Sequence, residues 1–152
     1  MEDKTIDEFQ IVTFKLGNER FGIDIDELLE IVRIENITRV PNTKNFVEGV
    51  INLRGKIIVV LDLLKKLNIG KIKITNSSRI LVVKTEEELT GLLVDSCEDV
   101  MTISIDKVQN APKILEEKIN TEYIRGVIFD KKEIIVLLDL NKLIAGKDFS
   151  LN

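Results

Sequence analysis

The sequence contains no histidine and no tryptophan, and only one cysteine and two prolines in 152 residues. Histidine is the usual general base at neutral pH and a frequent zinc ligand, so its absence argues against many enzymes and metal sites. A single Cys97 cannot form an internal disulfide, which fits a reducing compartment. A phosphate-binding loop of the GxxxxGK type is also missing. The sequence therefore predicts a protein that is not an enzyme and binds no metal or cofactor.

Aromatic residues and long apolar runs are scarce as well. Six phenylalanines and one tyrosine offer few platforms for stacking bases, and acidic and basic residues are interspersed along a chain of net charge −4. Both features argue against nucleic-acid binding. No run approaches the roughly 18 apolar residues of a membrane span, and the acidic start MEDKTIDEFQ does not resemble a signal peptide. We expect a cytoplasmic protein that does not insert into the membrane.

β-Branched residues, by contrast, are abundant. Isoleucine and valine together number 37, whereas there are only two alanines, and apolar residues make up 44% of the chain. Stiff β-branched side chains pack well on pleated sheets, and scarce alanine disfavours a helix bundle. The composition predicts a mainly β fold with a substantial core.

A sequence repeat organises the chain. FVEGVINLRGKIIVVLDL (Phe46–Leu63) returns 77 residues later as YIRGVIFDKKEIIVLLDL (Tyr123–Leu140), with nine identities in 18 positions. The segments 9–32 and 79–101 are also similar and align Gly22 with Gly91, where a glycine within a strand indicates a bulge or a close backbone approach. The repeat predicts two related β-barrels, each of about five short strands. We expect one domain over 1–152, with subdomains at about 8–75 and 76–146.

Smaller elements follow from local patterns. Asp62 and Asp139 end apolar strands where short helices would begin, so we expect each to cap the following helix. Asp24 and Asp26 are paired carboxylates that a turn or helix start explains. The joint at 70–78 keeps a strand pattern through Ile72 and Ile74, so we expect the halves to share an apolar interface. The stretch APKILEEKIN (111–120) fits either a loop or a short helix.

The two copies differ most at NLRGK against FDKKE. Arg54–Gly55 has the pattern of a hairpin tip in which Gly55 supplies a positive φ. Arg54 is then either a replaceable turn residue or an interface anchor, since arginine is enriched at interface hot spots. In either case we expect its charge to lie in solvent. Cys97 stands among acids that would raise its pKa, and it is best interpreted as a small, partly buried hydrophobe.

The segments FGIDIDELLEI, ITRVPNTKNFVEGVINLRGKIIVVLDL and TEYIRGV resemble the CheW-like domain family in order and over nearly the whole chain. The resemblance implies two five-stranded SH3-like barrels around a shared hydrophobic core, with short helices. It also implies a chemotaxis adaptor that couples methyl-accepting chemoreceptors to the histidine kinase CheA in signalling arrays.

In that family the helical receptor tip lies in a groove between the barrels, and the kinase contributes its regulatory domain. The matching receptor-binding positions here are Leu28, Glu30, Gly49, Asn52 and Arg54. Gly49 has a twin in Gly126, which favours a structural role for both. The kinase-binding residues cannot be placed from the sequence. Two alternatives stay open: a related module that serves a different histidine kinase or receptor, and a small enzyme with a carboxylate site.

Overall fold

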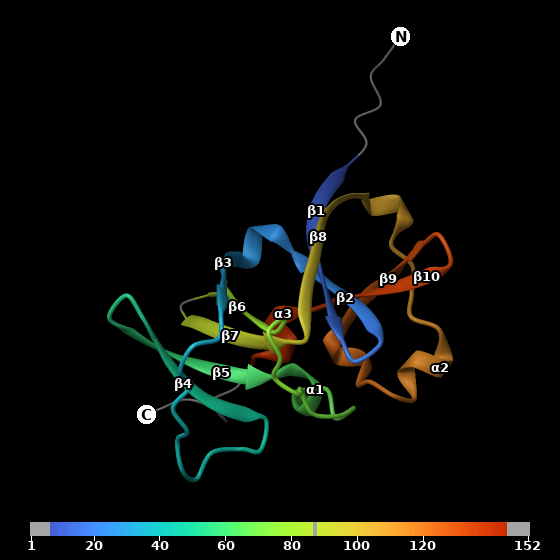
Figure 1. Ribbon diagram of the computed structural model, residues 1–152. Helices are drawn as coiled ribbons and strands as arrows, with labels where there is room; N and C mark the ends of the chain where they lie inside the picture. Colours follow the sequence, from blue (N-terminus) through green and yellow to red (C-terminus); the bar gives the residue numbers. More distant parts are fainter. Residues whose placement is uncertain (1–6, 87, 146–152) are drawn as a thin grey trace.

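The computed structural model describes residues 7–86 and 88–145, which form a mainly β structure with three short α-helices (Figure 1). The ends of the predicted domain, 1–6 and 146–152, and residue 87 lie outside the described residues. The strands are β1 (Glu8–Leu16), β2 (Glu19–Asp24), β3 (Leu28–Arg33), β4 (Val47–Leu53), β5 (Lys56–Asp62), β6 (Arg79–Thr85), β7 (Glu88–Val94), β8 (Ser96–Ser104), β9 (Ile124–Asp130) and β10 (Glu133–Leu138). The α-helices are α1 (Leu63–Lys66), α2 (Lys113–Glu116) and α3 (Leu140–Leu143), and the 3-10 turns are η1 (Ile25–Glu27), η2 (Ile105–Lys107) and η3 (Thr121–Tyr123).

The strands form two five-stranded sheets, as the repeat predicts, but the sheets do not follow the halves of the chain. Sheet A has the order β8-β1-β2-β10-β9, and sheet B has the order β3-β6-β7-β5-β4 (Figure 1). Each sheet therefore combines strands from both copies of the repeat. The predicted subdomains at 8–75 and 76–146 are wrong as structural units, because β5 pairs in parallel with β7 and β10 pairs in parallel with β2.

A single residue pair links the two edges of each sheet. After β3 the chain returns so that Thr38 and Val50 of β4 exchange two backbone hydrogen bonds, of 2.9 and 2.8 Å. After β8, Gln109 and Val127 of β9 exchange the equivalent two bonds, also of 2.9 and 2.8 Å. Linking the edges protects strand groups that would otherwise be free to pair with another chain. The two sheets thus have the form of related SH3-like barrels.

One hydrophobic core extends across both sheets, which confirms the expectation of a shared core. Phe14 and Phe21 of sheet A belong to the same buried cluster as Leu81 and Leu92 of sheet B. A second, smaller cluster lies within sheet A and consists of Ile11, Ile103, Ile128, Ile135 and Leu137. The joint at 70–78 contributes the buried Ile72, although it forms no strand and leaves Ile74 47% exposed.

Aspartate caps set the strand-to-helix transitions where the sequence predicts them. The Asp62 carboxylate accepts a hydrogen bond from the backbone N–H of Lys65, and Asp139 does the same for Lys142, both at 3.1 Å. Asp24 accepts from the N–H of Asp26 at 2.9 Å and begins η1, so a turn accounts for that carboxylate pair. The ambiguous stretch 111–120 contains the short helix α2.

Truncation of equivalent core residues tests the duplicated fold. Ile58 of β5 and Ile135 of β10 are 1% and 0% exposed. We expect Ile58→Ala and Ile135→Ala each to destabilise the protein by about 2–5 kcal/mol, because each leaves a cavity in a packed interior. Chemical denaturation followed by circular dichroism would measure the loss. An unchanged midpoint for either variant would contradict the buried position of that strand.

Candidate functional site

The five residues singled out from the sequence all lie on sheet B, on or beside its two edge strands. Leu28 and Glu30 lie in β3, Gly49 and Asn52 lie in β4, and Arg54 lies in the turn between β4 and β5. β3 and β4 are at opposite ends of the sheet order, and the Thr38–Val50 pair links them. The fold thus gathers into one region residues that are up to 26 positions apart in the sequence.

A two-residue turn projects Arg54 from the sheet. Arg54 and Gly55 have φ of +51° and +86°, the left-handed values that a tight hairpin of this kind requires at both central positions. The Asn52 side-chain oxygen accepts a hydrogen bond from the N–H of Gly55 at 2.9 Å and so stabilises the turn. The sequence predicts a positive φ for Gly55, whereas that of Arg54 is found only in the structure.

Glu30 and Arg54 form a bidentate ion pair. One guanidinium nitrogen of Arg54 donates to Oε1 of Glu30, and Nη2 donates to Oε2 at 3.0 Å. The Arg54 side chain is 74% exposed, as expected for a charge in solvent. The structure differs from that expectation only in the ion pair with Glu30. The hydrogen bonds from Arg54 hold the pKa of Glu30 below its usual range, and they raise the pKa of Arg54. Both groups are therefore charged at neutral pH.

Gly49 and Leu28 have structural roles as well. A Cβ added at Gly49 would lie 2.3 Å from the carbonyl oxygen of Thr38, in the pair that links the sheet edges. A Cβ at its twin Gly126 would lie 2.5 Å from Cγ1 of Val108 and 2.9 Å from the carbonyl oxygen of Gln109. Leu28 is half-buried against the core. Gly49 is accordingly required for the close approach of the sheet edges, as its repetition suggests.

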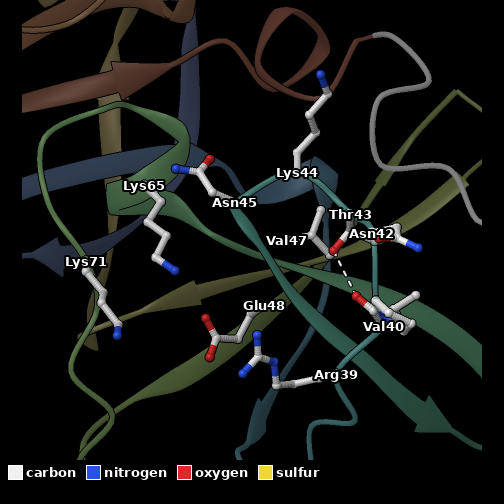
Figure 2. Close-up of a pocket in the computed structure, with 11 residues that line it drawn as sticks. Arg39, Val40, Asn42, Thr43, Lys44, Asn45, Val47, Glu48, Lys65 and Lys71 are labelled. Carbon is white, nitrogen blue, oxygen red and sulfur yellow. Dashed lines mark hydrogen bonds between the residues drawn. The ribbon is translucent and has the colours of Figure 1, made fainter.

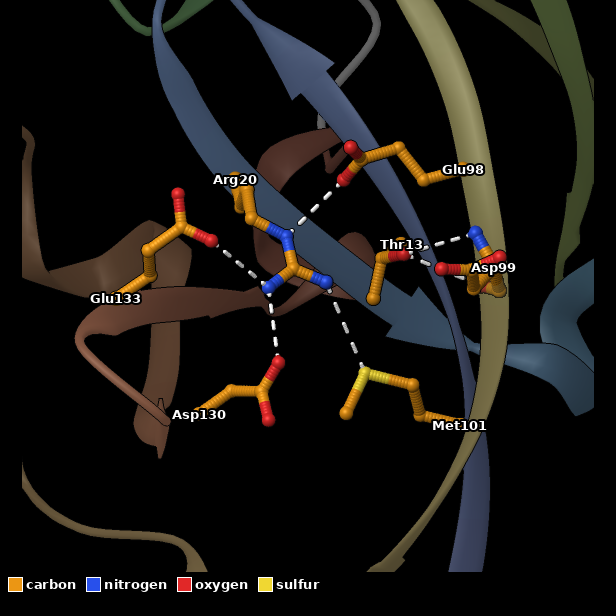
Figure 3. A network of polar contacts seen from close by, with 7 residues as sticks. All are labelled: Thr13, Arg20, Glu98, Asp99, Met101, Asp130 and Glu133. Atoms are coloured by element: carbon orange, nitrogen blue, oxygen red, sulfur yellow. Dashed lines mark hydrogen bonds and ion pairs between the residues drawn. The ribbon is translucent and has the colours of Figure 1, made fainter.

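The equivalent hairpin of sheet A is held differently, by Arg20 of β2 (Figure 3). Its Nε lies 3.0 Å from Glu98 of β8, and Nη1 lies 3.0 Å from Asp130 and 3.3 Å from Glu133 at the β9–β10 hairpin. The Arg20 side chain is only 11% exposed. Arg20 therefore connects the middle strand β2 to β8, β9 and β10 from a nearly buried position. Arg54, by contrast, reaches Glu30 from an exposed turn.

The structure also adds exposed residues that the sequence reasoning missed. Ile57 lies directly opposite Asn52 in the β4–β5 pairing and is 57% exposed, which places an exposed apolar residue next to Asn52. Lys131, which corresponds to Arg54 in the second copy, has φ of +58°. Among the ion pairs of residues 7–86 and 88–145, none includes Lys131. Among the described residues, the turn residue itself takes part in an ion pair in the first copy of the hairpin but not in the second.

An apolar groove of about 640 Å³ lies elsewhere on the molecule. It separates sheet A from the segment after β5, and its lining includes Leu16, Phe21, Leu64, Ile69 and Leu115. None of the five candidate residues lines it. The polar candidate site and the apolar groove are therefore distinct surfaces.

Cys97 is the one cysteine of the chain, and it is partly buried. Burial raises the pKa of the Cys97 thiol to about 11, so burial rather than the neighbouring acids is the main cause of the predicted shift. Within 7–86 and 88–145, no group of three or more cysteine, aspartate or glutamate residues is placed to hold a metal ion. No helix in these ranges has the length and hydrophobicity needed to cross a membrane.

Comparison with known proteins identifies the family. The CheW-like domain profile matches residues 10–148. The chain is 32% identical to "Chemotaxis protein CheW" of Treponema pallidum over 93% of this chain and 85% of that protein. It is 30% identical to "Protein FrzA" of Myxococcus xanthus over 90% and 86%.

A solved structure supports the same assignment. The scaffolding protein TtCheW from Thermoanaerobacter tengcongensis superposes with a TM-score of 0.86 and 34% identity, covering 100% of this chain and 99% of that chain. The profile, the relatives and the shared fold agree over nearly the full length, and the chain belongs to the CheW-like domain family.

Proposed function

We propose that this protein is a chemotaxis adaptor that couples methyl-accepting chemoreceptors to the histidine kinase CheA. It acts without catalysis in the cytoplasm, where binding to the receptor tips recruits it to membrane-associated arrays. The proposal draws on family membership and on relatives named as chemotaxis and scaffolding proteins. The kinase supplies its regulatory domain, and the receptor supplies the helical hairpin at its cytoplasmic tip.

The Glu30–Arg54 pair is the observation that carries the receptor-binding part of this proposal. Glu30 restrains an exposed guanidinium, which reduces the conformational entropy that Arg54 loses on binding a partner. Arginine has five N–H donors, and the Glu30 carboxylate uses two of the guanidinium nitrogens from one side. The Arg54 side chain is 74% exposed at the tip of the hairpin that also carries Asn52 and the exposed Ile57. Polar donors next to an apolar contact suit the surface of an amphipathic helix.

Replacing Arg54 tests this site. We expect Arg54→Ala to weaken binding of the receptor tip by about 30-fold or more, as truncation of a hot spot does. The melting temperature should change by no more than about 3 °C, because an exposed ion pair contributes little to stability. Isothermal titration with a receptor-tip fragment and thermal melting would measure the two effects. Kinase binding without receptor should persist, since the two partners are expected to use different faces.

Lys131→Ala is the matched control, because Lys131 occupies the equivalent turn position with a similar φ. It should leave receptor binding near that of the wild-type protein. The proposed site fails if Arg54→Ala unfolds the protein, or if that variant binds receptor and supports kinase activation as the wild type does.

The pH dependence gives a second test of the same pair. Because Arg54 lowers the pKa of Glu30, the stabilising interaction is present above the unfolded-state pKa of about 4.3 and is lost as pH falls through the lower folded-state value. Receptor affinity should therefore stay constant between about pH 6 and about pH 8. A strong change in that interval would show that another group controls binding.

A second candidate function is a module that serves a different histidine kinase or receptor system. The similarity to a relative named FrzA rather than CheW supports keeping it. Immobilised protein should retain CheA and a chemoreceptor from a lysate of the source cells if the first proposal holds. Retention of another kinase and receptor pair would favour the second.

A further inference from the structure

The charges of this acidic protein are unevenly distributed. The segment 38–75 contains eight lysines and arginines but only two acids, Glu48 and Asp62, although the whole chain has a net charge of −4. Asp62 is fully buried, where it caps α1 and accepts a hydrogen bond from the N–H of Ile72 at 2.9 Å. Glu48 is therefore the one acid that this segment can present at the surface. The segments that follow β3 and β5 bring several of these bases together.

Part of this basic segment encloses a pocket of about 580 Å³ (Figure 2). The loop 39–45 forms one wall, and Glu48, Lys65 of α1 and Lys71 form the other. Figure 2 shows the ammonium groups of Lys65 and Lys71 and the guanidinium of Arg39 directed toward the same space, beside the Glu48 carboxylate. Lys44 also lines the pocket, but its ammonium group is directed away from that space.

The three converging cations differ from Arg20 and Arg54, which are held in ion pairs. In the described parts of the chain, no ion pair includes Arg39, Lys65 or Lys71. Like charges that share a concave surface repel one another, and the low-dielectric walls strengthen the positive potential between them. Glu48 offsets only one of the three charges. The pocket thus attracts an anion.

We propose that this pocket binds a small phosphorylated polyol, a function beyond the coupling role. The volume is typical of small-molecule sites, which makes a compact ligand a better fit than a polymer. Arginine and lysine are the common phosphate ligands in proteins. The phosphate lies between Lys65, Lys71 and Arg39, and the hydroxyl groups of the ligand donate to the Glu48 carboxylate beside them.

The lining of the pocket also argues against a nucleotide ligand. None of the residues that line the pocket is aromatic, so a nucleobase would find no ring to stack on. A sugar phosphate and a lipid headgroup such as glycerol phosphate share the required chemistry, namely an anionic phosphate with neighbouring hydroxyls. The experiment must therefore separate a soluble ligand from a membrane surface.

Isothermal titration of the full chain with fructose 1,6-bisphosphate tests the soluble source, and sedimentation with phosphatidylcholine vesicles, with and without phosphatidylglycerol, tests the lipid source. We expect saturable binding to one of these probes, with one site per chain. The double variant Lys65→Gln/Lys71→Gln should weaken it by at least about tenfold, because two charge-assisted contacts are lost. Thermal melting of each variant checks that the fold is retained.

Two further variants distinguish a built pocket from general attraction to positive charge. Lys73→Gln removes a nearby exposed charge that does not line the pocket, and it should change binding by less than about twofold. Glu48→Gln should strengthen binding of inorganic pyrophosphate, which lacks hydroxyl groups, relative to that of fructose 1,6-bisphosphate.

Several results would overturn the proposal. They are the absence of saturable binding to either probe at low salt, equal losses for Lys73→Gln and the double variant, or a preference for pyrophosphate that Glu48→Gln leaves unchanged. The measurement needs neither receptor nor kinase, so its outcome is independent of the coupling function.

Discussion

Cutting the chain between Thr75 and Asn76 is expected to yield two fragments that do not fold separately. The first fragment contains β1 to β5, but in the intact protein those strands belong to two different sheets. Alone it keeps only the β1–β2 and β4–β5 hairpins and loses the central partners β10 and β7. Isolated hairpins are at best marginally stable in water. The second fragment loses its partners in the same way.

Mixing the two fragments in equal amounts should restore the structure, because together they contain every strand pair. Far-ultraviolet circular dichroism would report the recovered β signal, and the intact chain should unfold in one transition. Each fragment at twice the concentration, without its partner, is the control. A cooperative melt of the fragment 1–75 alone would contradict the exchange of strands between the halves.

The second large effect is expected for Gly49→Ala. Gly49 has φ of +154°, and an added Cβ would lie 2.3 Å from the Thr38 carbonyl oxygen and 2.8 Å from Cγ2 of Ile37. Backbone strain of about 1–3 kcal/mol would add to an overpacking cost of about 1–3 kcal/mol. We therefore expect a loss of about 2–6 kcal/mol in the free energy of unfolding, measured by chemical denaturation.

Gly70→Ala separates the two causes. Gly70 has the same φ of +154°, but its added Cβ would meet nothing nearer than Cδ1 of Leu64 at 3.7 Å. It should show only the strain, about 1–3 kcal/mol. Equal losses for both variants would mean that the close approach of Thr38 does not constrain Gly49. If Gly49→Ala stays folded but binds receptor more weakly, the cause would be displacement of the sheet edge and not the loss of a direct contact by Gly49.

The two hairpin tips show how a duplicated fold can support different surfaces. In sheet A, Arg20 ties the hairpin from a nearly buried position and uses its donors on three carboxylates. In sheet B, the residue at the tip itself makes the ion pair and keeps most of its surface exposed. The first arrangement stabilises the barrel, whereas the second leaves a charged group available to a partner.

Local chemistry in the sequence determined much of this protein. Abundant isoleucine and valine with scarce alanine predict the strands, and the 77-residue repeat predicts two related five-stranded units. Asp62 and Asp139 predict the helix starts, since a capping carboxylate acts within its own first turn. The repetition of Gly49 and Gly126 indicates their structural role before any contact is known. These features depend on neighbours close in sequence or on the comparison of two copies.

Only the tertiary structure decided which strands pair and which charges meet. Each copy contains hairpins that would fit either sheet, and the parallel pairs β2–β10 and β5–β7 join segments that no local pattern connects. Three features depend on that pairing. They are the contacts of Arg20 with Asp130 and Glu133, the contact of Glu30 with Arg54, and the pocket shared by Arg39, Lys65 and Lys71. The physical reason is that a strand's pattern specifies its buried face, whereas its partner is selected by the packing of the whole core.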